Sequence, residues 1–403
     1  MRIIKYLIVI LLTFASVSSF GQHLFKSKNK SAKAKSILPG SYLTTEYFNL
    51  LHDKKVAIVA NKTSLINNTH LVDTLISSGI NVVKIFGPEH GFRSNQPDGK
   101  DIDNDIDPKS GVEIVSLYGS HRKPTKDDLD NVDIVLFDIQ DVGVRFYTYI
   151  STLALVMEAC AESNIPIIIA DRPNPNGFYV DGPVLDTAFS SFVGMHPVPI
   201  VYGMTIGEYA TMVNGEKWLS DSITCRLTVI KCKNYTHKSR YLLPVAPSPN
   251  LQDMQSVYLY PSLCLFEGTV VSVGRGTDSP FKVYGHPLLK PASYSFIPNP
   301  IAGVSEDPPL KGMVCYGQNL GEHAELISKN GLIELSWLLD AYNTICPQTD
   351  FFRTYFDKLA GGTLLREQIE WGINEKEIRQ SWQAGLKDFI KIREKYLLYD
   401  DFK

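Results

Sequence analysis

The sequence of 403 residues lacks the short motifs of several large enzyme classes. No Gly-x-Gly-x-x-Gly follows the first predicted strand, and no phosphate loop ends in Gly-Lys-Ser/Thr, so the sequence gives little support for a nucleotide cofactor. No Gly-x-Ser-x-Gly turn is present either, which argues against a serine hydrolase of the α/β type. With a net charge of −3 and no basic stripe, the chain is not expected to bind nucleic acid.

Cysteine is scarce and scattered, with no Cys-x-x-Cys pair, so a zinc site is not expected. The six cysteines are Cys160, Cys225, Cys232, Cys264, Cys315 and Cys346. Their spacing leaves both disulfides and buried thiols open. An acidic run at residues 101–105 has Ile106 and Val112 where a calcium-binding EF-hand needs Gly and Glu. We therefore predict no metal and no cofactor.

Long apolar runs are absent apart from one near the N-terminus. Arg2 and Lys5 precede the run 6–12, and small residues follow it up to Gly21. This pattern predicts a secretory signal peptide over residues 1–21; the alternative is a membrane anchor, for which the run is short. Residues 22–38 are rich in lysine and predict a disordered basic leader, with contact to an anionic surface as the alternative. We expect export to the periplasm or outer surface, with no stable membrane insertion after cleavage.

Four short apolar runs, at residues 56–60, 82–85, 134–137 and 167–170, are present in the first half of the chain. Continuous apolar runs of this length are typical of strands buried on both faces of a parallel sheet. Predicted helices alternate with them, which favours an α/β fold with right-handed crossovers. We predict a Rossmann-like parallel-sheet domain over residues 39–286 and a smaller α+β domain over 287–403, because residues 287–309 are rich in proline.

The same patterns predict the remaining elements. Thr205 is expected to cap a helix, because Glu208 follows it at capping-box spacing. Further strands are predicted at 113–117, 227–230 and 269–273, and helices at 70–78, 124–130, 150–163, 331–345 and 376–395.

Polar side chains follow three of the predicted strands. Ligands bind beyond the carboxyl ends of strands in open α/β sheets, so these side chains are candidates for one site. Glu89 follows a Gly-Pro turn between two phenylalanines, and such apolar surroundings favour a protonated carboxyl group that can act as a general acid. The alternative is a structural Glu held by helix N-termini or by Arg93. His90 can orient Glu89, bind a sugar hydroxyl or ligate a metal, or make a structural hydrogen bond.

The other strand ends supply further candidates. A carboxylate at one of these strand ends can act as a base or accept a hydrogen bond from a sugar hydroxyl. Its alternative role is to cap the following loop. Arginines can grip a carboxylate in a bidentate fashion or form internal ion pairs. Glycines near Arg275 let backbone N–H groups approach an anion or a sugar. The candidates are Arg93, Asp138, Gln140, Asp141, Arg145, Tyr147, Arg172, Glu267, Arg275 and Thr277.

Several long motifs resemble a known family. They run from Phe-Gly-Pro-Glu-His-Gly-Phe-Arg at 86–93 and Ser-Leu-Tyr-Gly at 116–119 through the segment 137–149 to Asp-Arg-Pro-Asn-Pro at 171–175. Ser-Pro-Asn at 248–250, Tyr-Pro at 260–261, Glu-Gly-Thr at 267–269, the segment 272–277, Trp382 and the segment 393–399 follow in order. Over residues 40–403 the chain resembles the bacterial exo-β-N-acetylmuramidases, NamZ-type glycoside hydrolases formerly filed as a domain of unknown function.

The resemblance implies a Rossmann-like domain, a smaller C-terminal domain and a cleft near their junction. It also implies release of N-acetylmuramic acid from the non-reducing ends of peptidoglycan fragments, with muropeptides or disaccharides as partners. Glu89 is the implied acid, and Glu267 or Asp141 the second carboxylate. Arg145, Arg172 or Arg275 would bind the lactyl carboxylate of the sugar. Retaining, inverting and substrate-assisted mechanisms all remain open.

Two other functions fit the same residues. A metal-dependent hydrolase would use Glu89, His90 and Asp138. A non-catalytic protein would bind wall sugars in the same cleft, because a fold alone does not determine function.

Overall fold

The computed structural model of the chain describes residues 35–93 and 105–402. The predicted signal peptide, most of the predicted leader and residues 101–104 of the acidic run lie outside the described residues, so these predictions stay untested. Within the described part of the chain, no helix is long and apolar enough to cross a membrane.

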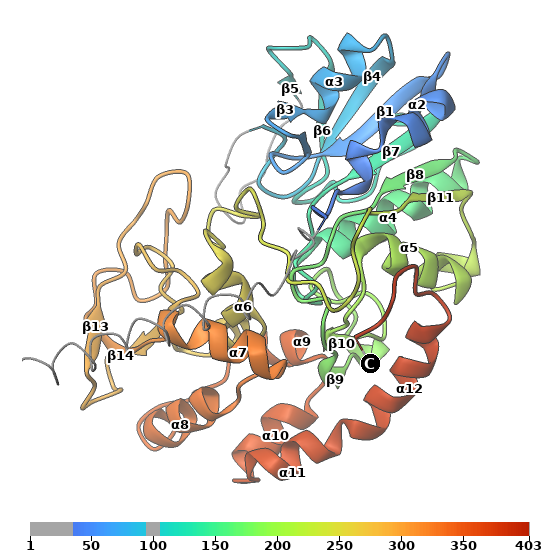
Figure 1. Cartoon of the computed structure of the whole chain (residues 1–403). Helices are drawn as coiled ribbons and strands as arrows, with labels where there is room; N and C mark the ends of the chain where they lie inside the picture. The colour runs from blue at the N-terminus through green and yellow to red at the C-terminus, as the bar shows by residue number, and fades with distance from the viewer. Residues whose placement is uncertain (1–34, 94–104, 403) are drawn as a thin grey trace, which may run out of the picture. The chain divides into compact units, whose positions relative to one another are not determined.

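A mostly parallel sheet forms the centre of the described residues, as predicted (Figure 1). Its seven strands have the order β11-β8-β7-β1-β4-β6-β5, and only the pairing of β5 with β6 is antiparallel among them. The strands are β1 (Lys55–Ala60), β4 (Asn81–Gly87), β5 (Asp105–Ile106), β6 (Glu113–Ser116), β7 (Ile134–Asp138), β8 (Ile167–Ala170) and β11 (Leu227–Ile230). The fold class predicted from the apolar runs is confirmed.

The side chains of the central strands point alternately into two hydrophobic cores, which explains why the apolar runs of these strands are continuous. Val59 and Phe137 point into one hydrophobic core, whereas their neighbours Ile58 and Leu136 point into another on the opposite face. Successive side chains of a strand face opposite sides, so a strand covered on both faces has no solvent-facing position to fill with polar residues.

Helices cover both faces of this sheet (Figure 1). Side chains of α2 (Thr44–Leu51) and α3 (Leu71–Ser77) complete one core. Those of α4 (Tyr149–Glu162) and α5 (Ile206–Gly215) complete the other. The predicted Thr205–Glu208 capping box at the start of α5 is present.

The smaller elements are shorter and more irregular. The remaining strands are β2 (Leu65–Ile66), β3 (Thr69–His70), β9 (Asp181–Val184), β10 (Pro199–Val201), β12 (Val283–His286), β13 (Tyr294–Phe296) and β14 (Cys315–Asn319). The remaining helices are α6 (Met254–Leu263), α7 (Ala324–Asn330), α8 (Ser336–Ile345), α9 (Phe356–Ala360), α10 (Leu364–Glu370), α11 (Glu375–Ser381) and α12 (Gln383–Glu394). Short 3-10 turns are η1 (Gly40–Tyr42), η2 (Thr187–Phe189), η3 (Ser220–Ser222), η4 (Cys264–Gly268) and η5 (Gly321–His323).

Four predicted elements differ from the structure. Residues 126–130 form turns and no helix: Thr125 and Asp128 make the reciprocal hydrogen bonds of a capping box, but the chain turns at Asn131 (φ 60°) before a helix develops. Residues 269–273 make only isolated bridges, since Thr269 and Ser272 pair with different partners. The predicted helix 331–345 begins at Ser336, and the predicted helix 376–395 is divided at Trp382.

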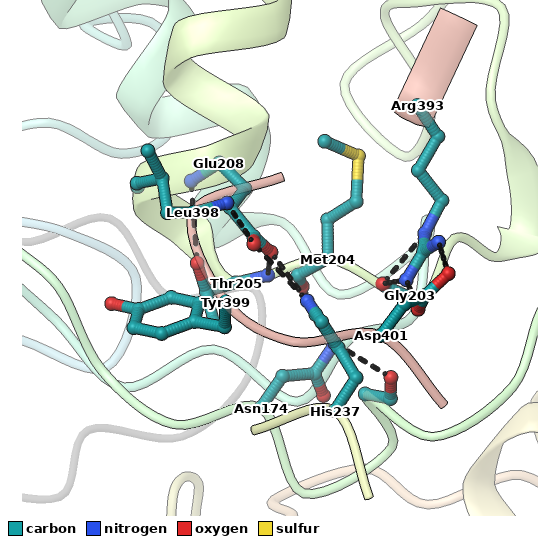
Figure 2. Close-up of polar contacts among 12 residues, drawn as sticks. Asn174, Gly203, Met204, Thr205, Glu208, His237, Arg393, Leu398, Tyr399 and Asp401 are labelled. Carbon is teal, nitrogen blue, oxygen red and sulfur yellow. Dashed lines mark hydrogen bonds and ion pairs between the residues drawn. The ribbon is translucent and has the colours of Figure 1, made fainter. Parts of the chain in front are cut away.

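The C-terminal tail returns to the parallel-sheet part and docks on the start of α5 (Figure 2). The backbone N–H of Leu398 donates to Glu208 Oε1 at 2.7 Å, and His237 Nε2 lies 3.0 Å from Glu208 Oε2. Arg393 donates to the carbonyl of Gly203 and forms an ion pair with Asp401 at 2.8 Å. Through these contacts the segment 393–399 anchors the last helix to the start of α5.

Candidate active site

A pocket of about 630 Å³, counting its mouth, lies where the turn after β4 meets η4 and the start of α9. Its lining includes five of the predicted site residues, Glu89, His90, Tyr147, Glu267 and Arg275. They come from segments up to 186 positions apart in the chain, as the numbering of Glu89 and Arg275 shows (275 − 89).

The end of β4 places Glu89 at the pocket. Gly87 closes the strand, and the turn after it needs the left-handed backbone conformation at His90 (φ 72°) and Gly91 (φ 79°). A non-glycine residue at such a φ costs free energy, and such residues occur often at functional sites. The Thr148 hydroxyl, at the N-cap of α4, donates a 2.7 Å hydrogen bond to Glu89 Oε2. The carboxyl group is thereby held in one orientation.

A second carboxylate reaches the pocket from the chain after α6. Glu267 lies on η4, and its Oε1 accepts a 2.6 Å hydrogen bond from Arg275 Nε. Arg275 sits between Gly274 and Gly276, which both have positive φ and turn the chain back. Its guanidinium also lies over the Phe281 ring, 5.0 Å from the centroid. The predicted Glu267 and Arg275 therefore form one ion pair inside the pocket.

Two effects oppose each other in this pair. Burial raises the pKa of Glu267 to about 7 and lowers that of Arg275 to about 10. The direct 2.6 Å contact favours the charged form of both groups, because a charge-assisted hydrogen bond is strongest between ions. We give the direct contact more weight than burial and therefore take Glu267 as ionised in the empty pocket. Loss of the contact would leave burial to dominate.

Aromatic rings form much of the remaining wall. Tyr260 packs edge-on against Phe146, Tyr147 and Phe281, with ring centroids 4.9–6.0 Å apart. Tyr355, just before α9, also lines the pocket. Burial raises the pKa of the Tyr147 and Tyr260 hydroxyls well above 10, so both stay neutral donors. Apolar rings with a few polar groups suit one face of a sugar.

Asp138 and Arg172 end neighbouring strands as predicted, but they face each other. Arg172 Nε and Nη2 donate to the two Asp138 carboxylate oxygens at 2.6 and 2.8 Å. Both side chains are nearly inaccessible, at 0% for Asp138 and 3% for Arg172. They lie outside the pocket lining and form the internal ion pair that was the alternative reading.

Arg145 is also fully buried and outside the pocket lining. Its guanidinium donates to four backbone carbonyls, of Pro183, Val198, Leu359 and Ala360. This cage ties α9, which carries a wall of the pocket, to the strands β9 and β10.

The other predicted site residues lie outside the pocket lining as well. Arg93 forms ion pairs with Asp73 and Asp107. The Gln140 amide donates to the carbonyls of Asp141 and Pro173. Asp141 Oδ2 accepts from Gly143 N at 2.6 Å and from the Tyr202 hydroxyl, and burial raises its pKa to about 6. Thr277 donates to the carbonyl of Gly274.

The lining contains residues that no prediction singled out, among them Thr148, Cys264 and Tyr355. Thr148 lies within the family motif 137–149, and its position just before the predicted helix 150–163 could have marked it as a helix-capping residue. Cys264 donates weakly from Sγ to Glu267 Oε2, 3.4 Å away. Tyr355 precedes a five-residue helix and had no signal in the sequence.

The described residues contain no group of three or more His, Cys, Asp and Glu side chains arranged to hold a metal ion. Glu89 and His90 line the pocket, whereas Asp138 pairs with Arg172. All six cysteines are described, and none forms a disulfide.

Two family models together match most of the chain. Residues 56–255 match the N-terminal model of exo-β-N-acetylmuramidase NamZ, and residues 258–399 match the C-terminal model. The N-terminal model ends about thirty residues before the domain boundary predicted at 286/287 (286 − 255 = 31). The domain boundary stays a prediction.

Individual proteins agree. The chain is 39% identical over 399 residues to the peptidoglycan β-N-acetylmuramidase NamZ of Bacillus subtilis (strain 168), covering 93% of this chain and 94% of that protein. Two crystal structures of DUF1343 family proteins from Bacteroides fragilis are also similar. One is 48% identical with a TM-score of 0.85 and covers 91% of this chain and 100% of its own. The other is 28% identical with a TM-score of 0.76 and covers 90% and 99%. The chain belongs to the exo-β-N-acetylmuramidase NamZ family of glycoside hydrolases.

Proposed function

We propose that this protein is an exported, exo-acting hydrolase that releases N-acetylmuramic acid from the non-reducing ends of peptidoglycan fragments. The observation that carries the proposal is the meeting of Glu89 with the Glu267–Arg275 pair in one pocket. Glycoside hydrolysis uses two carboxyl groups beside the scissile bond, and this pocket supplies them. The named activity of the Bacillus subtilis relative supports the choice of substrate.

Each residue has a task in this proposal. Glu89, oriented by Thr148, donates a proton to the leaving glycosidic oxygen. Glu267 acts on the other side of the reacting carbon, either directly or by orienting the acetamido group. Arg275 attracts the lactyl carboxylate, and the rings of Tyr260 and Phe281 offer an apolar wall to the sugar.

Product analysis on a disaccharide with N-acetylmuramic acid at its non-reducing end tests this proposal. We expect free N-acetylmuramic acid, equal activity with and without a chelator, and no product when N-acetylglucosamine occupies the terminal position. Loss of activity with a chelator would favour the metal-dependent hydrolase instead. Tight binding without any product from disaccharides or muropeptides would favour a non-catalytic binding protein.

Export is part of the proposal and rests on the predicted signal peptide. Expression of the full chain in a Gram-negative host, followed by fractionation and N-terminal sequencing, tests it. We expect a periplasmic product that begins close to residue 22. An uncleaved chain in the membrane fraction would contradict export and favour the anchor.

A further inference from the structure

Tyr355 lines the pocket but has no task in the proposed function. It lies directly before α9 and shares the pocket with Glu89, Glu267 and Arg275. Tyr355 is 40% exposed, whereas Phe356 beside it is completely buried. The buried neighbour holds the chain in the core while the tyrosine side chain stays open to the pocket.

The segment that carries Tyr355 is clamped to the segment that carries Glu267. The backbone N–H of Arg353 donates to the carbonyl of Gly268 at 2.8 Å. A Cβ on Gly268 would lie 2.4 Å from the Cα of Phe356, so the two backbones are in direct contact and only glycine fits there. The position of Tyr355 relative to Glu267 is therefore fixed by backbone contacts on either side of the tyrosine.

The Tyr355 hydroxyl is a hydrogen-bond donor at the pocket. It makes no hydrogen bond to any residue that the structure describes. Partial burial, together with the nearby Cys264 thiol and Glu267 carboxylate, raises the pKa of Tyr355 above its usual 10.0, so the hydroxyl keeps its proton. Its electrostatic neighbours also include Glu89 and Arg275. A ligand acceptor that enters beside Arg275 thus meets a neutral donor as well as a cation.

Resting on the proposed function, we propose that the Tyr355 hydroxyl donates a hydrogen bond to the lactyl carboxylate of the substrate and, with Arg275, forms the binding site for that group. Glu267 stays on Arg275 Nε in this arrangement and keeps its task in hydrolysis. Tyr355 is then a specificity-determining residue, because N-acetylglucosamine has no lactyl group to accept its proton. A hydrogen bond to a carboxylate is stronger than one between neutral groups.

Arg93 shows in this chain how one guanidinium serves two carboxylates. It donates to Asp73 from Nη1 and Nη2, and to Asp107 from Nε and Nη2. The Ser110 hydroxyl also donates to Asp107, so one of the two carboxylates receives a neutral hydroxyl in addition to the shared cation. Like charges that share one cation repel each other, and a further donor offsets part of that cost. We assign Tyr355 the same part for the lactyl carboxylate on Arg275.

Kinetics of Tyr355→Phe on the disaccharide with terminal N-acetylmuramic acid test this role. The variant keeps the ring and removes only the hydroxyl. We expect KM to rise about tenfold and kcat to stay within about twofold, because the lactyl group lies away from the bond that breaks and is held equally in the ground state and the transition state. The melting temperature should not change, since the hydroxyl has no partner among the described residues.

Inhibition by the free sugars separates the lactyl group from the rest of the ligand. N-Acetylmuramic acid should inhibit Tyr355→Phe about tenfold more weakly than the wild type. N-Acetylglucosamine should inhibit both proteins to the same extent. The matched control is Tyr294→Phe, which removes a tyrosine hydroxyl on β13, outside the pocket lining. It should behave like the wild type with both sugars.

The outcomes separate the role of Tyr355 from the proposed function. Unchanged KM and unchanged inhibition by N-acetylmuramic acid in Tyr355→Phe overturn the role. Equal weakening for both sugars overturns it too, because the hydroxyl would then bind a group that the sugars share, and so does a fall in kcat at constant KM. All three results leave the hydrolase standing, since the wild type cleaves the disaccharide. A wild type that neither binds nor cleaves any muramic acid compound overturns both.

Discussion

The carboxylate–arginine pairs Asp138–Arg172 and Glu267–Arg275 have the same chemistry and differ in their surroundings and in their exposure to solvent. The first closes the ends of two neighbouring strands and is sealed from solvent. The second lies in a pocket between irregular segments, where side-chain oxygens remain within reach of a ligand. The comparison teaches that charge at a strand end is not enough for a site: in this chain the sheet provides a rigid frame, and turns and loops beside it carry the candidate chemistry.

The largest effect on stability should come from breaking the sealed pair. Asp138→Ala leaves the Arg172 guanidinium buried without its partner, which we expect to cost about 3–5 kcal/mol of unfolding free energy. Urea unfolding measures this loss. The double variant Asp138→Leu with Arg172→Met should recover much of it and hydrolyse the disaccharide once folded. A stable but inactive double variant would show that Asp138 or Arg172 is needed for activity, and would contradict a purely structural role for this pair.

Acid should weaken the frame through a buried histidine. His196 is 5% exposed, and burial lowers its pKa from 6.5 to about 4. The unfolded chain therefore binds a proton before the folded chain does, so stability falls as the pH drops from about 6.5 towards 4, by up to about 3 kcal/mol from this residue. Urea unfolding at several pH values should show a smaller decline in His196→Asn. The exposed control His52→Asn should follow the wild type; an unchanged decline in His196→Asn would contradict the assignment.

One contact of the C-terminal tail should contribute less to the unfolding free energy than the sealed pair or the buried histidine. The Tyr399 hydroxyl donates to Asp171 Oδ2 at 2.5 Å and accepts from the backbone N–H of Cys232. Tyr399→Phe removes both bonds, and we expect a loss of about 1–2 kcal/mol in unfolding free energy. Thermal melting measures the loss, and hydrolysis by the folded variant should be unchanged. A large fall in kcat without a change in melting temperature would move the tail into the site.

The smallest effect on stability should come from the pocket itself. Thr148→Val keeps the shape of the side chain and removes the hydrogen bond to Glu89. We expect kcat to fall about tenfold with KM nearly unchanged, and the melting temperature to change little. Thr148→Ser restores the hydroxyl and should restore kcat. A rise in KM at constant kcat would show that Thr148 binds substrate instead of orienting the acid.

The sequence was sufficient for the sheet and for part of the pocket. Runs such as 134–137 predicted buried strands because both faces of the sheet are covered, and the turn after 82–86 placed Glu89 at a strand end. The sequence was insufficient where contacts are distant. The sequence predicted that Asp138 and Arg172 lie at one edge of the sheet, but it did not show that they form an ion pair with each other. Tyr355 reaches the pocket through distant contacts: α9 packs on η4, and Arg145 ties the end of α9 to strands far away in the chain.

The irregular elements failed for local reasons. Residues 269–273 have the composition of a strand, but their two bridging residues find separate partners. Residues 124–130 have helical spacing and a Thr125–Asp128 capping box, but the chain turns at Asn131 (φ 60°) after little more than one turn. Such local endings are decided by a few contacts and are weakly encoded in apolar periodicity.

The most direct measurement compares the wild type with Glu89→Gln on a disaccharide that carries N-acetylmuramic acid at its non-reducing end. Our account predicts that the variant folds, binds the disaccharide within a few-fold of the wild-type affinity and releases N-acetylmuramic acid at least about 10³-fold more slowly, because glutamine cannot donate the proton. Release at the wild-type rate by Glu89→Gln would contradict the account.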